Sequence, residues 1–126
     1  MATDLTKHYV LLNTDGASIT TQGGNAFWSQ SPDQLDAYGR GWLVSEYEFA
    51  SDWKQWEMHP EADELLRVIA GETELQLEWP TGIQSVVLRA DQAYVVPKGV
   101  WHTAKAAAPC RMLHITMGAG TQHRPL

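Results

Sequence analysis

Residues 57–71 read Glu-Met-His-Pro-Glu-Ala-Asp-Glu-Leu-Leu-Arg-Val-Ile-Ala-Gly, and residues 97–102 read Pro-Lys-Gly-Val-Trp-His. Glu57 and His59 are two residues apart, so on an extended strand their side chains leave the same face. Glu64 opens the next apolar run, and His102 follows a Pro-x-Gly turn. We expect the turns between these strands to gather the four side chains at one point. Neutral imidazole and carboxylate oxygen together suit a divalent ion such as Mn, Fe, Ni, Co or Zn.

The residues around these segments follow an all-β pattern. From residue 42 onward, short apolar or alternating runs are separated by turn residues, which is typical of a β-barrel or sandwich. Leu75 and Leu77 alternate with polar residues, so that strand is predicted to bury one face and expose the other. The predicted strands are 42–49, 55–59, 64–69, 72–79, 84–88, 93–96, 103–106 and 111–117.

The length of 126 residues predicts one domain with a core of its own. We expect residues 42–117 to form the barrel core. Residues 1–41 are predicted to form an N-terminal arm, with an edge strand at 8–12 and a short helix that begins at Ser31 and Pro32. Residues 118–126 are predicted to form a loop or a solvated tail.

Charge and cysteine content narrow the classes of partner. The formal net charge is -6, with 15 acidic and 9 basic residues, which argues against nucleic acid or an anionic membrane as the partner. We expect a small-molecule substrate or ligand instead. Cys110 is the only cysteine, so no internal disulfide can form, and a buried, inert thiol is the expected state. The first residues lack the apolar stretch of a signal peptide, and no run reaches the ~20 apolar residues of a membrane span, so the expected location is cytoplasmic.

The spacing of the first segment resembles the first motif of the cupin family. That motif runs Gly, five residues, His-x-His, three or four residues, Glu, six residues, Gly. Its positions fall in this chain on Ser51, Glu57, His59, Glu64 and Gly71. The spacing agrees throughout, while Ser51 replaces the first glycine and Glu57 replaces the first histidine.

The second segment resembles the second cupin motif in the same way. That motif runs Gly, five residues, Pro-x-Gly, two residues, His, three residues, Asn. Its positions fall on Asp91, Pro97, Gly99, His102 and Ala106, so the first and last identities differ. Together with the run from Leu113 to Thr116, the two motifs are similar to those of a bacterial single-domain cupin subgroup.

The resemblance implies a cupin double-stranded β-helix, or jelly-roll barrel, made of two antiparallel sheets with the site inside the barrel near its mouth. Cupins usually hold a divalent metal ion with three histidines and a glutamate. The resemblance therefore implies that Glu57, His59, Glu64 and His102 would hold Mn, Fe, Ni or Zn here. It also implies a homodimer.

Three functions remain open at this point. The first is a metal-dependent enzyme on a small organic molecule, of the dioxygenase, isomerase or epimerase, decarboxylase or cyclase type known among small cupins. The second is a non-enzymatic cupin that binds a small ligand, with or without metal. The third is a metal-free site in which Glu57 and Glu64 repel each other, so that one carries a raised pKa and the pair transfers protons.

Other polar and aromatic side chains are ranked lower. Asp63 is a rival ligand, but one residue before Glu64 it points to the opposite face of a strand. His114, in phase with Met112 and Thr116 on the last predicted strand, has two interpretations: a side chain that reaches the site in the barrel interior or a core histidine, and the second is favoured. His8 and His123, near the termini, carry no signal of a site. The side chains of Trp56, Met58 and Trp101 have the opposite strand parity to the ligands and are expected to face away from the interior.

Overall fold

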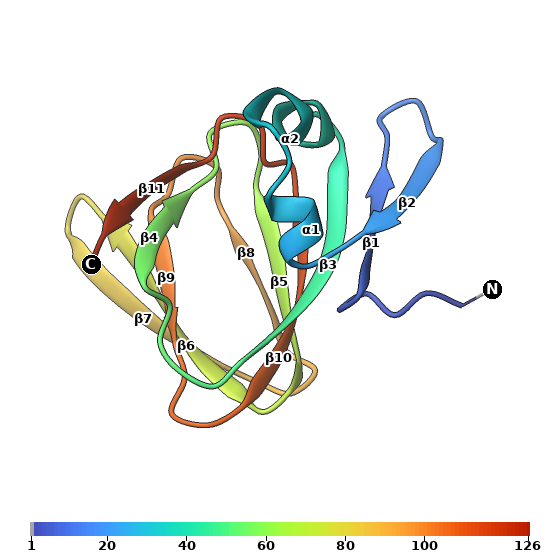
Figure 1. Ribbon diagram of the computed structural model, residues 1–126. Coiled ribbons are helices and arrows are strands. Elements are labelled where there is room, and N and C mark those ends of the chain that lie inside the picture. The colour runs from blue at the N-terminus through green and yellow to red at the C-terminus, as the bar shows by residue number, and fades with distance from the viewer. Residues whose placement is uncertain (1) are drawn as a thin grey trace.

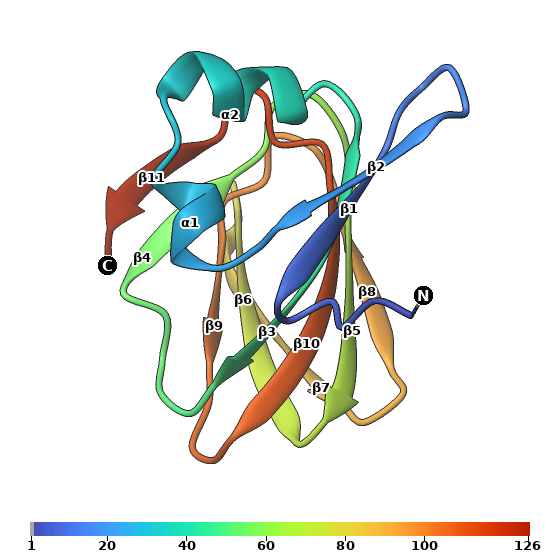
Figure 2. The same ribbon diagram turned by 45° about the vertical axis from the view of Figure 1, so that its right-hand side comes forward.

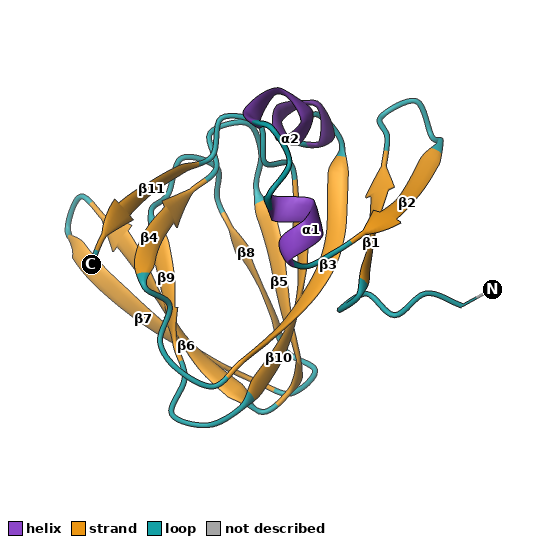
Figure 3. Cartoon of the chain, in the orientation of Figure 1, coloured by secondary structure: helices purple, strands orange, loops and turns teal. Residues whose placement is uncertain are grey.

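The computed structural model describes residues 2–126, which form eleven strands and two short helices (Figure 1). Figure 3 shows how strongly the strands dominate the chain. The elements in chain order are β1 (His8–Leu12), β2 (Ser18–Gln22), α1 (Asn25–Trp28), α2 (Pro32–Tyr38), β3 (Trp42–Phe49), β4 (Gln55–Met58), β5 (Glu64–Ala70), β6 (Glu72–Trp79), β7 (Gly82–Arg89), β8 (Ala93–Val96), β9 (His102–Lys105), β10 (Cys110–Thr116) and β11 (Gln122–Pro125).

The strands form two antiparallel sheets that face each other (Figures 1 and 2). One has six strands in the order β2-β1-β3-β10-β5-β8, and the other has five in the order β11-β4-β9-β6-β7. Strands distant in sequence pair side by side, as β3 does with β10 and β4 with β9. This arrangement confirms the expected all-β jelly roll of two antiparallel sheets.

Strand alternation places the core between the sheets. Leu66 and Val68 on β5, and Leu75 and Leu77 on β6, have no exposed surface. The two side chains on each strand are two residues apart and therefore leave the same face, as the sequence predicts for Leu75 and Leu77. Glu64 is in phase with Leu66, so the same alternation carries its carboxylate into the barrel interior, where it is 3% exposed.

The helix α2 begins as the sequence predicts. The Ser31 hydroxyl accepts a hydrogen bond from the backbone N–H of Gln34, the Gln34 side chain accepts one from the Ser31 N–H, and Pro32 occupies the first turn. The short helix α1 is an addition to the prediction, and its Phe27 packs on Tyr9 and Tyr38. Within residues 2–126, no helix has the length and apolar character that crossing a membrane requires.

The N-terminal hairpin also goes beyond the prediction. The edge strand β1 is confirmed, and β2 pairs with it over its whole length. In Figure 1 this hairpin projects sideways from the barrel. The residues of β2 are almost all exposed, so they show no buried face, and hydrophobic alternation cannot reveal such a strand.

The prediction of a C-terminal loop or tail is wrong for Gln122–Pro125, which form β11 and pair antiparallel with β4. The guanidinium of Arg124 lies over the rings of Trp56 and Trp101 at 5.4 and 4.6 Å and pairs with Glu78. These contacts stabilise a strand that has no apolar pattern of its own. They also place the two tryptophans beneath Arg124, on the sheet face opposite the site, as their strand parity predicts.

Candidate metal centre

Three side chains of the second sheet form a cluster that could hold a metal ion. Glu57 on β4 lies directly opposite His102 on β9, and His59 follows β4 by one residue. One ligand atom from each of the three lies within 4.8 Å of the others. His59 and His102 are 5% and 0% exposed, while Glu57 is the more accessible member. The pairing of β4 with β9 thus joins the two motif segments at one place.

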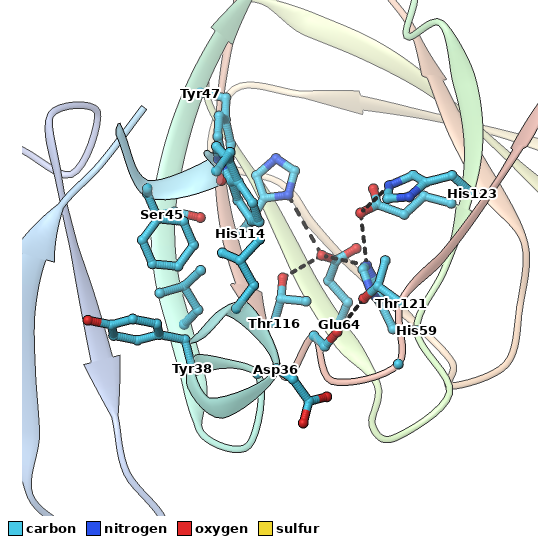
Figure 4. Close-up of a pocket in the computed structure, with 18 of the residues that line it drawn as sticks. Asp36, Tyr38, Ser45, Tyr47, His59, Glu64, His114, Thr116, Thr121 and His123 are labelled. Carbon is cyan, nitrogen blue, oxygen red and sulfur yellow. Dashed lines mark hydrogen bonds and ion pairs between the residues drawn. The ribbon is translucent and has the colours of Figure 1, made fainter. Parts of the chain in front are cut away.

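Glu64 approaches the cluster from the other sheet, because β5 carries it into the interior. Its carboxylate oxygens lie 3.1 Å from Nε2 of His102 and 3.3 Å from Nε2 of His59. The hydroxyl of Thr116 donates a hydrogen bond of 2.5 Å to Glu64 Oε2 (Figure 4). The structure therefore brings together all four side chains predicted from the sequence. Their binding of a metal stays a prediction.

In both His59 and His102, the ring nitrogen that points away from the cluster, Nδ1, has a hydrogen-bond partner that fixes the orientation of the ring. His102 Nδ1 lies 3.0 Å from the carbonyl oxygen of Val100 and must donate to it. His59 Nδ1 lies 2.8 Å from the Thr121 hydroxyl, which donates its own proton to the Gly118 carbonyl and so accepts from the ring. A neutral ring protonated at Nδ1 has a free lone pair on Nε2, and both Nε2 atoms face the cluster.

Within residues 2–126, several buried polar atoms at this point make no hydrogen bond. They are Nε2 of His59, Nε2 of His102, Nε2 of His114 and Oε1 of Glu64. The approaches between the histidines and Glu64 are short, but their directions do not meet hydrogen-bond geometry. A buried polar atom without a partner costs roughly 1–3 kcal/mol. A divalent ion bound to the Nε2 lone pairs and a carboxylate oxygen would satisfy such atoms, so the donor set fits a metal.

The two carboxylates stay ionised in this environment. Burial raises the pKa of Glu64, but contacts with His102, His114 and His59 outweigh it and hold the pKa well below its usual value. For Glu57, burial also raises the pKa, and the contacts with His123, His59 and His102 together bring the net shift downward. The prediction that one carboxylate of a metal-free pair would have a raised pKa is therefore wrong. Repulsion between the two is present, but the histidines dominate it.

His102 responds to the same charges in the opposite direction. Burial lowers its pKa, but Glu64, the Val100 carbonyl and Glu57 together raise it by more, so the net pKa lies above the usual value for histidine. In the absence of a metal, His102 thus holds a proton to a higher pH than an exposed histidine does. A metal ion that binds Nε2 must displace this proton.

His123 is a site residue that sequence reasoning missed. Its Nε2 lies 3.6 Å from Glu57 Oε1, and this contact raises the pKa of His123 while lowering that of Glu57. The pairing of β11 with β4 places the two opposite each other. No motif or alternation marks residues 118–126, so nothing in the sequence could have pointed to this pair.

Of the two side chains that the sequence ranked below the four ligands, His114 lies beside the site and Asp63 does not. His114 is buried at 8% exposure, but it lines the cavity beside the site, with Nδ1 3.7 Å from Glu64 Oε2, so it is more than a core histidine. Its phase with Met112 on β10 was the available signal. Asp63 is exposed and accepts a hydrogen bond from the Lys98 N–H, which turns it away from the cluster as its strand parity predicts.

A cavity of about 700 Å³ adjoins the metal cluster. Its walls come from the barrel interior, from α1 and α2, and from the segment that precedes β11. In Figure 4, His59 and His123 lie at one side of this space, Tyr38 and Ser45 at the other, and Glu64 and His114 between them. Trp28 lines the cavity and is half exposed, so the space reaches the molecular surface there. The volume suits a small organic molecule.

Comparison with known proteins places this geometry in context. The Cupin_2 family, described as a cupin domain, matches residues 46–116, which include every residue of the predicted ligand set. A search of curated proteins finds no match.

Three solved structures illustrate the similarity. A protein from Neisseria meningitidis is 24% identical, with a TM-score of 0.52 over 60% of this chain and 72% of that one. A cupin superfamily protein from Desulfitobacterium hafniense is 22% identical, with a TM-score of 0.52 over 61% and 67%. Hydroxypropylphosphonic acid epoxidase from S. wedmorenis is 14% identical, with a TM-score of 0.54 over 62% and 44%. Similarity at these identities shows the fold alone.

Proposed function

This chain belongs to the cupin family, and from that premise we propose that it is a metal-dependent enzyme acting on a small organic molecule. In this proposal Glu57, His59 and His102 hold a divalent ion, and Glu64 lies beside them as a fourth ligand. One observation carries it: the Nε2 atoms of both histidines are buried, make no hydrogen bond in the described part of the chain, and lie beside the carboxylates of Glu57 and Glu64.

The donor set limits the metal and leaves room for chemistry. Two imidazoles with one or two carboxylates suit Mn, Fe, Ni or Zn, and the pattern of two histidines and one carboxylate is typical of open non-haem iron sites. When bound, such an ion supplies Lewis acidity or activates oxygen. Oxygenase and isomerase reactions are the classes we propose.

The protein's own groups would orient a substrate and manage charge. The cavity would bring a small molecule next to the cluster, because Glu57, His59 and Glu64 are part of its lining. Glu57, the more accessible carboxylate, is paired with His123 and can exchange a proton with the cavity. Glu64 stays ionised and buried, and so offsets the positive charge that an ion brings.

The first test is a titration of untagged, chelator-treated protein with Mn, Fe(II), Ni and Zn. We expect one ion per chain and a rise in melting temperature on the order of 10 °C when free metal reaches about 100 times its dissociation constant. Because the ion displaces the proton of His102, affinity should weaken by about tenfold per pH unit as the pH falls through the raised pKa of that residue. Calorimetry at several pH values measures both effects. No bound metal and no thermal shift with any of these ions would refute the proposal.

A second test addresses the residue behind His59. In Thr121→Val the hydroxyl that accepts from His59 Nδ1 is lost, while shape and volume are nearly kept. Outer partners of this kind fix the tautomer of a ligand histidine, so metal affinity should fall by about 10- to 100-fold. Thr121→Ser keeps the hydroxyl and is expected to bind metal like the parent protein. Equal affinities of the Val and Ser variants would contradict the assignment.

A further inference from the structure

The cavity beside the metal cluster has a group of six aromatic side chains in its walls. Its lining includes Phe27, Trp28, Tyr38, Tyr47, Phe49 and Trp53. Several of these rings already contact one another edge to face, as Phe27 does with Trp28 at 4.8 Å. Aromatic walls of this kind pack well against the face or edge of another flat ring. The shape and chemistry of the walls therefore favour a planar, largely apolar ligand.

Among the polar groups of this cavity, His114 is held from three sides. Its ring stacks on Trp53 with centroids 5.9 Å apart and an interplanar angle of 21°, and it meets Tyr47 edge to face at 4.8 Å. Its Nδ1 faces Glu64 Oε2 at 3.7 Å. Ser45 lies directly opposite His114 on β3 and also lines the cavity. The ring therefore has little freedom to turn.

One atom of this fixed ring has no partner. Nε2 of His114 is buried and makes no hydrogen bond in the part of the chain that the structure describes. The negative oxygen of Glu64 beside Nδ1 favours the tautomer with its proton on Nδ1. Nε2 then has a free lone pair and acts as a hydrogen-bond acceptor. A ligand that satisfies it must bring a donor.

We infer that the cavity binds a hydroxylated aromatic ring, a phenol, whose hydroxyl donates a hydrogen bond to His114 Nε2 while its ring packs among the aromatic walls. The inference deepens the proposed function and rests on it, because the phenol would be the substrate class presented to the metal. His114 is a binding residue in this scheme and is separate from the metal ligands.

The test measures binding of 2-naphthol, 2-methoxynaphthalene and decahydro-2-naphthol by quenching of tryptophan fluorescence or by calorimetry. The methoxy compound keeps the planar ring but has no donor, and the decahydro compound keeps the hydroxyl but is not planar. We expect 2-naphthol to bind about tenfold more tightly than either, which is the effect of one satisfied buried hydrogen bond or of lost ring packing. The measurements are made on metal-free and on Mn-loaded protein.

Variants of His114 test whether its hydrogen bond, and not the shape of the cavity alone, causes the preference for 2-naphthol. His114→Phe keeps a flat ring between Trp53 and Tyr47 but has no acceptor, so the preference for 2-naphthol over 2-methoxynaphthalene should disappear. His114→Gln offers a carbonyl acceptor and should keep part of the preference. His8→Phe, on the exposed face of β1, is the matched control and should behave like the parent.

The outcomes are distinguishable. Equal affinity of the parent protein for 2-naphthol and either comparator, or an unchanged preference in His114→Phe, would overturn the inference. If His114→Phe does not fold, the parent's selectivity and that of His114→Gln decide the matter. Metal binding is measured separately. If the protein binds no metal but still prefers 2-naphthol, only the proposed metal-dependent function is refuted. If it binds metal but shows no preference for 2-naphthol, only the phenol inference is refuted.

Discussion

His102→Ala is expected to abolish stoichiometric metal binding. His102 is completely buried, its Nδ1 is committed to the Val100 carbonyl, and its Nε2 faces Glu57, His59 and Glu64. No other described nitrogen occupies that position, so the ion would lose one of only two imidazole ligands. Metal content measured on the untagged variant should fall from about one ion per chain to near zero, and the metal-dependent rise in melting temperature should vanish.

The design must separate ligand loss from misfolding. Removing one partner of a buried charged contact can itself cost about 3–5 kcal/mol, because Glu64 would lose one of the three histidines that compensate its charge. His102→Gln nearly fills the space and can donate to Glu64, so it should fold and still fail to bind metal. His8→Ala changes an exposed histidine and should retain the ion. Full metal content in a folded His102→Gln protein would rule out the proposed ligand set.

Among glycine-to-alanine substitutions in the turns of the barrel, Gly71→Ala is expected to lower the free energy of unfolding the most. Gly71 links β5 to β6 with φ of +79°, and a Cβ there would overlap the carbonyl oxygen of Pro109. The left-handed backbone alone costs an L-residue roughly 1–2 kcal/mol, and the overlap with a backbone atom adds strain. The loss in the free energy of unfolding should reach about 3 kcal/mol or more.

Gly99 is a matched control, because its φ is also +79° and, among residues 2–126, no heavy atom beyond its own chain neighbours lies within 4 Å of the place that a Cβ would take. Gly99→Ala therefore has only the backbone cost of about 1–2 kcal/mol. The comparison uses urea denaturation of both variants in the presence of a chelator, so that metal binding does not enter. Equal losses in the two variants would show that the contact with Pro109 is unimportant.

The fold was predictable because it depends on spacing more than on identity. Asp91 occupies a cupin glycine position, yet its φ of +70° keeps the left-handed backbone that the turn requires. Aspartate is among the residues that tolerate this conformation. The predicted strands of the barrel core agree with the structure within one or two residues at most ends. Alternation reports which face is buried, and in a barrel the buried face determines the pairing.

The candidate site was predictable only in part. Glu57, His59, Glu64 and His102 lie in motif positions, and the structure gathers them as expected. The groups that orient His59 and keep Glu57 ionised were not predictable. They are Thr121 and His123, and both lie in a C-terminal segment for which the sequence predicts a loop or tail. Their strand forms because β4 offers a free edge and because Arg124 lies over two tryptophans. Such contacts leave no periodic pattern.

The sequence by itself determined the jelly roll and the side chains that converge, since motif spacing and strand parity are local properties that fix direction and face. Only the tertiary structure decided the state of those side chains. Histidines from several strands surround Glu64 and keep it ionised, and the partners of Nδ1 turn two imidazole lone pairs inward. It also decided that His114 lines a cavity, and that its buried Nε2 has no hydrogen bond among the described residues. Protonation, tautomer and cavity walls depend on distances between residues far apart in the chain, and these distances exist only after folding.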